Sequence, residues 1–155
     1  MFKRSIYTFI ETAKNHKKIK NIKKNQCIQN VTLLTSEYLN ENGIKYLALD
    51  FDGVLASHGK PTINSEVKVW LDTFVLEFDE SKIFILSNKP TNDRLEYFKS
   101  NYPRIKFISN VAKKPYPDGL LKIRETVNCE AKEIALVDDL CKNDVAVLSC
   151  GGSSR

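Results

Sequence analysis

The sequence has few features of a membrane-spanning, secreted or zinc-binding protein. No apolar run approaches the roughly 20 residues that a membrane-spanning helix needs. Lys3 and Arg4 stand near the start, but no apolar stretch long enough for a signal peptide follows them. The four cysteines are widely spaced, without a CxxC pair or a histidine cluster, which argues against a zinc site and a disulfide framework. We therefore expect a cytoplasmic protein with reduced thiols.

Acidic residues are nearly absent from the first 30 positions. This segment holds eight lysines and arginines and a single acid, Glu11, so its net charge is +7, and the rest of the 155-residue chain carries −2. The basic charge therefore belongs to an N-terminal arm, which argues against a nucleic-acid-binding core. We predict a basic, partly amphipathic arm over residues 1–30 and one domain over residues 31–155.

Apolar residues recur at helical spacing within this arm, at Phe2, Ile6, Phe9 and Ile10. A basic amphipathic helix of this kind suits peripheral attachment to an anionic membrane surface, such as the inner membrane surface. A helix that packs on the domain and leaves its lysines in water explains the pattern somewhat better. A mitochondrial presequence is a third explanation, although the basic residues here are almost all lysine.

The rest of the chain alternates short apolar runs with stretches of helical periodicity. The runs are Tyr46 to Leu49, Ile83 to Leu86, Phe107 to Ile108, and Ile134 to Val137. Helical stripes that include Val67, Leu95 and Leu120 separate them. Continuous apolar strands that alternate with helices indicate βαβ units and a buried parallel sheet. We predict an α/β fold, a three-layer Rossmann-like arrangement with helices on both faces of the sheet.

Polar side chains follow each predicted strand. They are Asp50, Asp52 and Gly53 after the first run, Ser87 and Asn88 after the second, Lys113 and Lys114 beyond the third, and Asp138, Asp139 and Asp144 after the fourth. Ligands of open α/β sheets bind at the carboxyl ends of the strands. Acids, a hydroxyl and a lysine around one point would form a plausible phosphoryl site.

The segment Asp50-Phe51-Asp52-Gly53 carries the strongest signal. Residues two apart in a strand point the same way, and Gly53 permits a tight turn after them. Two carboxylates on one face repel each other unless a cation lies between them. Asp138, Asp139 and Asp144 supply further oxygen ligands of the type that Mg²⁺ prefers. A magnesium site is therefore expected here.

The order of these motifs resembles that of the haloacid dehalogenase (HAD) superfamily. The resemblance rests on Asp50 to Leu55, Leu86-Ser87-Asn88, Lys114-Pro115, and Asp139 followed by Asp144. The segment from Leu39 to Leu55, with its Asn-Gly-Ile-Lys stretch, is similar to the capless IIIA subgroup, which includes YqeG-like proteins and phosphatidylglycerophosphate phosphatases. The likeness covers roughly residues 33–152 and implies a phosphatase that requires Mg²⁺.

The resemblance also implies a role for each motif residue. Asp50 would be the nucleophile that forms an aspartyl-phosphate, and Asp52 would be the general acid and base, with its backbone carbonyl on the metal. Lys114 would neutralise the nucleophile and the developing charge. Ser87, Asn88 and Lys114 would bind the substrate phosphate. The metal ligands would be Asp50, Asp52, Asp139 and Asp144, with Asp138 as an alternative to Asp139.

The chain departs from the family pattern at two points. Asp138 stands where the subgroup usually has glycine, which adds a carboxylate beside Asp139. After Asp144 the pattern implies a helix and then a further apolar strand, whereas this sequence ends at Gly151 to Arg155. The last strand of the fold is therefore in question, and with it the activity.

The spacing of the motifs leaves no room for a cap domain. An open site suits a large or surface-embedded substrate, such as phosphatidylglycerophosphate, and His58, Lys60 and Lys89 are candidate residues at its rim. Another phosphomonoester of the cytosol is an alternative substrate, and an inactive HAD-like binding module is an alternative function. A phosphoacceptor receiver domain fits less well, because the acid pair and the phosphorylated aspartate would stand in a different order.

Overall fold

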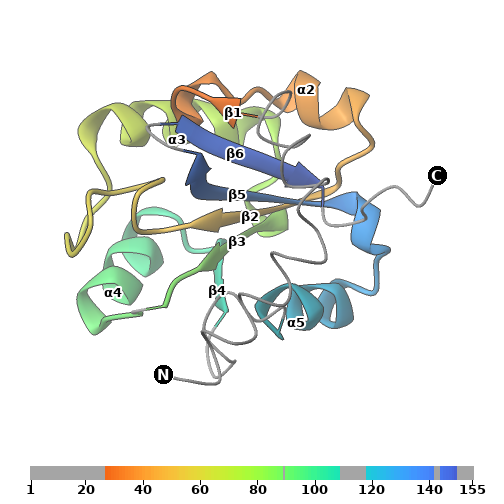
Figure 1. Ribbon diagram of the computed structural model, residues 1–155. Helices are drawn as coiled ribbons and strands as arrows, with labels where there is room; N and C mark the ends of the chain where they lie inside the picture. The colour runs from red at the N-terminus through yellow and green to blue at the C-terminus, as the bar shows by residue number, and fades with distance from the viewer. Residues whose placement is uncertain (1–26, 89, 109–117, 142–143, 150–155) are drawn as a thin grey trace, which may run out of the picture.

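The computed structural model describes residues 27–88, 90–108, 118–141 and 144–149 of the chain (Figure 1). Its strands are β1 (Cys27–Ile28), β2 (Tyr46–Asp50), β3 (Ile83–Leu86), β4 (Lys106–Ile108), β5 (Ile134–Cys141) and β6 (Asp144–Ser149). Its α-helices are α2 (Ser36–Glu41), α3 (Ser65–Glu77), α4 (Asn92–Asn101) and α5 (Asp118–Val127). Three 3-10 turns, η1 (Val31–Leu33), η2 (Glu80–Lys82) and η3 (Ala131–Glu133), precede α2, β3 and β5.

The six strands form one sheet in the order β1-β6-β5-β2-β3-β4. The four predicted apolar runs are β2, β3, β4 and β5, and these strands pair parallel to one another. Between them the chain crosses through α3, α4 and α5. The predicted α/β class with an open parallel sheet is therefore confirmed.

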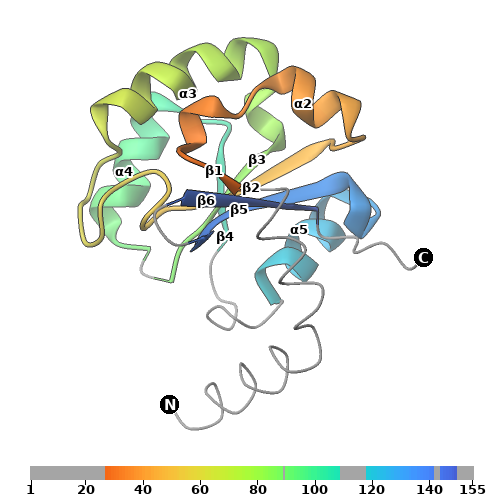
Figure 2. The ribbon, with the colours of Figure 1, turned by 45° about the horizontal axis from the view of Figure 1, so that its top comes forward.

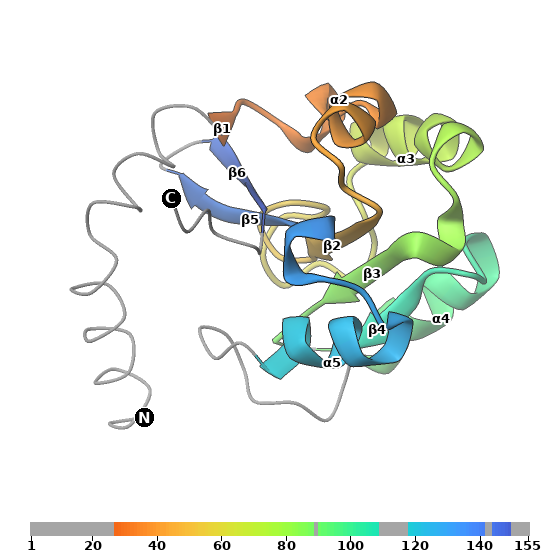
Figure 3. The ribbon, with the colours of Figure 1, turned by 90° about the vertical axis from the view of Figure 1, so that its right-hand side faces the viewer.

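The parallel strands are buried because helices cover both faces of the sheet. Leu47, Leu49, Ile83 and Ile85 share a hydrophobic cluster with residues of α2, α3 and α4, whereas Ala48 and its neighbours on the other face pack with α5. The alternation follows the period of two of a strand. Figure 2 shows α2 and α3 above the sheet and α5 beneath it, and Figure 3 shows the same layers from the side.

The crossover helices bury much of the stripes that their sequences predict, but α4 exchanges one residue and Leu121 of the α5 stripe is 46% exposed. In α3, Val67, Leu71 and Phe74 are buried. In α4, Leu95 belongs to the predicted stripe but is 37% exposed, while its neighbour Arg94 is 2% exposed. The buried face of α4 is therefore turned by one residue and carries a cation.

The segment after Asp139 differs from the family expectation. A helix was expected around Asp144, but that residue begins β6, which pairs antiparallel with both β5 and β1. β5 continues past Val137 to Cys141, and β6 returns along it in a hairpin. The run Val145-Ala146-Val147-Leu148 is rich in β-branched residues, which favour a strand where an unpaired sheet edge is available.

The described residues include no helix that is both long and apolar enough to cross a membrane. The predicted arm of residues 1–30 lies mostly outside the described part of the chain. Its last residues reach the sheet, because Cys27 and Ile28 form β1 beside β6. The division of the chain at residue 31 stays a prediction.

Candidate functional site

The topology gives the sheet one point where neighbouring strands connect in opposite directions. β2 lies between β5 and β3, so the chain leaves β2 toward one edge and later returns to its other side. Crevices at the carboxyl ends of such strand pairs are the usual ligand sites of open α/β sheets. Asp50 ends β2, and Asp138 and Asp139 lie in β5 just beyond the residues paired with β2.

Three aspartates meet at this point. Asp50, Asp138 and Asp139 can each offer one carboxylate oxygen such that all three oxygens lie within 4.8 Å of one another. Asp50 and Asp138 are each 6% exposed, whereas the side chain of Asp139 is 41% exposed. Leu49 pairs with Val137, so Asp50 and Asp138 occupy the next position of two parallel strands. The structure thus brings both aspartates of β5 to the predicted nucleophile.

The turn after β2 requires glycine at position 53. Gly53 has a φ of +86°, a left-handed conformation that L-residues rarely adopt. A Cβ at this position would also stand 2.5 Å from Oδ2 of Asp139. The backbone N–H of Gly53 donates to the carbonyl of Ala56, which closes the turn. The predicted tight turn is therefore present, and it leaves the space that the Asp139 carboxylate occupies.

Asp52 lies outside the group of three aspartates and binds a different partner. Nη1 and Nη2 of Arg94 donate to its two carboxylate oxygens at 2.9 and 2.7 Å. The backbone N–H of Gly59 donates to Oδ1 of Asp52 at 3.1 Å. The hydrogen bonds from Arg94 lower the pKa of Asp52 below its ordinary value, against the opposing effect of burial. Asp52 is therefore held as an ionised carboxylate.

Ser87 and Asn88 follow β3, next to Asp50, and both are partly buried. β3 pairs with β2 through Asp50 and Leu86, so Ser87 stands one residue beyond the partner of the predicted nucleophile. Its hydroxyl accepts a hydrogen bond from Nη1 of Arg94 at 3.2 Å. The predicted phosphate-binding hydroxyl and Asp52 thus share one guanidinium group.

Two of the predicted rim residues also lie at this end of the sheet. Nε2 of His58 is 3.7 Å from Oδ2 of Asp139, on a largely exposed imidazole. The backbone carbonyl of Lys60 accepts from Nε and Nη2 of Arg94 at 3.1 and 2.9 Å. The loop that carries both residues is therefore attached to the site through Arg94.

Some predicted site residues cannot be compared with the structure. Lys114, the predicted catalytic and phosphate-binding lysine, and Lys89, a rim candidate, lie outside the described residues. The backbone of Asp144 pairs with Cys141 at the start of β6, but its side chain is outside the described part. The roles of Lys114 and Asp144 stay predictions.

Arg94 is the residue of this site that the sequence pattern did not single out. Leu95 and Phe98 predicted an apolar stripe that does not include Arg94. A single arginine on a helix is normally a surface residue. Its spacing of four from Phe98 places both on one helix face. The signal that could have identified Arg94 is therefore its position four residues before the buried Phe98.

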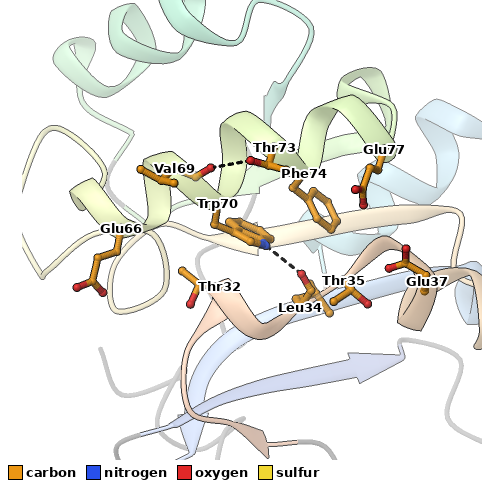
Figure 4. Close-up of a pocket in the computed structure, with 10 residues that line it drawn as sticks. All are labelled: Thr32, Leu34, Thr35, Glu37, Glu66, Val69, Trp70, Thr73, Phe74 and Glu77. Atoms are coloured by element: carbon orange, nitrogen blue, oxygen red, sulfur yellow. Dashed lines mark hydrogen bonds between the residues drawn. The ribbon is translucent and has the colours of Figure 1, made fainter.

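A separate hollow of about 710 Å³ lies between α3 and the segment of η1 and α2. Figure 4 shows Trp70 within it, with Nε1 donating to the carbonyl of Leu34 at 2.9 Å. Three glutamates, Glu37, Glu66 and Glu77, also line it. None of the predicted site residues lines this hollow.

Comparisons of the chain with protein-family models, with curated proteins and with solved structures found no match. The functional argument therefore rests on the motifs and on the geometry of the strand ends.

Proposed function

We propose that this chain is a Mg²⁺-dependent phosphomonoester hydrolase of the HAD type, which acts through an aspartyl-phosphate. The observation that carries the proposal is the meeting of Asp50, Asp138 and Asp139, with oxygens within 4.8 Å, at the point where the strand order reverses. The hydroxyl of Ser87 follows the adjacent strand. The order of the motifs along the sequence supports the same function independently.

The three carboxylates suit a small hard cation. Mg²⁺ binds oxygen ligands at about 2.0–2.1 Å in octahedral geometry, so neighbouring ligand oxygens lie roughly 3 Å apart and opposite ones roughly 4 Å apart. The three oxygens all lie within 4.8 Å of one another, an upper limit slightly above the largest of these separations. Asp50 and Asp138 are nearly buried, where the mutual repulsion of two carboxylates is costly without a cation. Bound Mg²⁺ would neutralise charge on the substrate phosphoryl group.

In the proposed reaction, a carboxylate oxygen of Asp50 attacks the phosphorus and displaces the leaving oxygen, which takes a proton. Water then attacks the phosphorus of the aspartyl-phosphate, gives up a proton, and releases inorganic phosphate from Asp50. Covalent catalysis by Asp50 divides one difficult hydrolysis into two easier steps. Asp50 ends a buried strand and pairs with Leu86 of β3, which supports a fixed position for the attacking group.

Asp52 is the proposed group for the two proton transfers, since it follows the nucleophile by two residues. In the first step it would give a proton to the leaving oxygen, and it must first take that proton from solvent, against the lowering of its pKa by the hydrogen bonds from Arg94. In the second step its ionised carboxylate would accept a proton from water. Ser87 and Asn88 would donate hydrogen bonds to the phosphoryl oxygens, and Lys114 would supply a positive charge. Asp139 and Asp138 would hold the metal together with Asp50 and the backbone carbonyl of Asp52, with Asp144 as a further ligand.

The proposed substrate is a large phosphomonoester or one embedded in a surface, with a lipid phosphate such as phosphatidylglycerophosphate as the first choice. The excess positive charge of residues 1–30 supports contact with an anionic surface. The spacing between the motifs, which is too short for a cap domain, supports an open site. A smaller phosphomonoester of the cytosol is the alternative substrate.

The test is hydrolysis of an aryl phosphate and of phosphatidylglycerophosphate by the full chain, with Mg²⁺ or with EDTA. We expect turnover that requires Mg²⁺ and that Asp50→Asn reduces by three or more orders of magnitude, on the order of the losses seen when other covalent nucleophiles are removed. Asp79→Asn, on an exposed residue away from the site, is the control and should retain activity. Turnover that survives Asp50→Asn would exclude Asp50 as the nucleophile.

A binding module without activity is the second candidate. The observation that favours it is the start of β6 at Asp144, where the resemblance implies a helix. Mg²⁺ binding by calorimetry without turnover on either substrate would select this function over catalysis.

A further inference from the structure

Arg94 is a buried cation that donates hydrogen bonds to segments at the carboxyl ends of the sheet. Its side chain is 2% exposed, and it donates to both carboxylate oxygens of Asp52, to the carbonyl of Lys60 and to the hydroxyl of Ser87. Its Cζ also lies 4.0 Å from the centre of the Phe51 ring. A single side chain therefore joins the end of β2, the end of β3 and the loop around residue 60.

These contacts fix the orientation of Asp52 relative to the guanidinium group of Arg94. Two of its nitrogens face Asp52 in the parallel, two-point arrangement that only a planar fork can make. Nε and Nη2 both donate to the carbonyl of Lys60, in the loop that follows the Gly53 turn. The backbone N–H of Gly59, in the same loop, donates to Oδ1 of Asp52, the oxygen that Nη2 also contacts. Asp52 is consequently fixed in direction by donors from two separate segments.

A buried arginine that served only the core would be costly. Removing a guanidinium group from water carries a large desolvation penalty, and an apolar residue of similar volume often stabilises a protein as well or better. The surroundings of position 94 include the ring of Phe51 and the apolar cluster to which Phe51 and Phe98 belong, which an apolar side chain such as methionine would also suit. The burial of Arg94 is better explained by its hydrogen bonds to Asp52, Ser87 and the carbonyl of Lys60 than by a contribution to the stability of the core.

We propose that Arg94 is a positioning residue: it fixes the direction of Asp52 and latches the loop of residues 57–60 to the ends of β2 and β3. The expected effect of Arg94 on kcat rests on the proposed phosphatase function. The attachment of the 57–60 loop by Arg94, here called the latch, does not depend on that function. Because Nη1 contacts both Asp52 and Ser87, the residue proposed for proton transfer and the residue proposed for phosphate binding keep a fixed relation through this one group.

The first experiment measures the latch without any need for turnover. Amide hydrogen exchange at Gly59, followed by NMR in the full chain, reports the bond from its N–H to Asp52. Arg94→Lys keeps the charge but loses the fork, so we expect exchange at Gly59 to accelerate by at least about tenfold relative to core amides such as Leu49. Arg104→Lys, on a surface ion pair with Asp79, is the matched control and should leave Gly59 unchanged.

An unchanged exchange rate at Gly59 in folded Arg94→Lys would overturn the proposal. If Arg94→Lys fails to fold, Arg94→Met decides by the same measurement, because it removes the fork and the buried charge while it leaves Asp52, the acceptor of the Gly59 N–H, in place. Faster exchange at Gly59 in Arg94→Met supports the latch, and exchange equal to that of the unaltered chain overturns it.

The second experiment measures positioning through kinetics on an aryl phosphate. A displaced Asp52 should lower kcat by roughly 10²-fold, as small displacements of catalytic groups do, and should leave KM within a few-fold of its original value. Thermal unfolding of the same variants separates this effect from stability. If Arg94→Lys loses stability but keeps kcat, Arg94 is a core residue only, and the positioning role is wrong. If the unaltered chain does not turn over, the proposed function fails, while exchange at Gly59 still decides the latch.

Discussion

At the scale of single residues, the site depends on a close approach between a backbone and a carboxylate. Gly53 turns the chain after β2 with a positive φ, and the side chain of Asp139 occupies the space beside its Cα. The same glycine therefore serves the turn and the position of a predicted metal ligand. The sequence predicted the first role through the Asp-Gly pair, whereas the second appears only when β5 is placed beside β2.

Gly53→Ala should damage both stability and metal binding. A left-handed alanine costs roughly 1–2 kcal/mol, and the added Cβ would in addition displace Asp139. We expect the affinity for Mg²⁺, measured by titration calorimetry, to fall by about 10- to 100-fold, the range for a disturbed ligand support. Urea unfolding gives the accompanying loss in the free energy of unfolding.

Gly43→Ala is the control for backbone strain alone. Gly43 also has a positive φ, +68°, but a Cβ there would meet nothing within 4 Å. This variant should lose about the same strain energy and keep its affinity for Mg²⁺. Equal Mg²⁺ affinity in both variants would contradict the claimed contact between position 53 and Asp139.

The residues of the site differ in how far the sequence could identify them. Asp50, Ser87 and Asp138 could be predicted, because each follows a continuous apolar run and strand ends of a parallel sheet converge. The partner of Asp52 could not, since Arg94 lies 42 positions away, and its burial depends on how α4 rotates against the sheet. Contacts of this kind depend on tertiary packing, which periodicity does not give.

At the scale of elements, a hydrogen-bonded group of side chains joins α3 to the end of α4. Asp72 of α3 accepts from Tyr102 Oη at 2.6 Å and from Lys68 Nζ at 2.8 Å. The bond from Lys68, followed by that from Tyr102, lowers the pKa of Asp72 below its ordinary value. Both helices cover the face of the sheet that carries Leu47 and Leu49.

The lowered pKa of Asp72 predicts a loss of stability in acid. A carboxyl group whose pKa is lower in the folded state stabilises the protein fully above its ordinary pKa of about 4, and this contribution is lost as the pH falls through the lowered value. Asp72→Asn should therefore be less stable than the unaltered chain at neutral pH, by about 1 kcal/mol or less because the side chain is half exposed.

The measurement is urea unfolding of both proteins between neutral pH and about pH 3, where the difference should shrink. Glu96→Gln, at an exposed position of α4, is the control for a general change of charge. A difference between Asp72→Asn and the unaltered chain that stays constant with pH would show that Asp72 does not contribute through its ionised form.

The elements themselves could be predicted to different degrees. β2, β3 and β5 stand out because strands buried on both faces read as continuous apolar runs. β6 could not be predicted from the family resemblance, which implied a helix at Asp144, because pairing with an open edge of the sheet decides its conformation. The two-residue strand β1 has no periodicity of its own and exists through its pairing with β6.

At the scale of the whole molecule, the strand order locates the site. The chain passes through α3, α4 and α5 between the parallel strands, and the reversal of strand order beside β2 brings β5 next to the strand that ends at Asp50. The sequence predicted a parallel sheet and the residues at its strand ends. The sequence did not predict the order of the strands. That order places β5 beside β2 and so brings Asp138 and Asp139 close to Asp50.

The most direct test of the proposed phosphatase is to trap the phosphoryl group on the chain. The full-length protein is mixed with an aryl phosphate and Mg²⁺, quenched in acid, reduced with borohydride and mapped by mass spectrometry, since reduction converts an aspartyl-phosphate to homoserine. We predict homoserine at position 50, absent when EDTA replaces Mg²⁺. Turnover without homoserine at position 50, or homoserine at position 52 in its place, would contradict the assignment of Asp50 as the nucleophile.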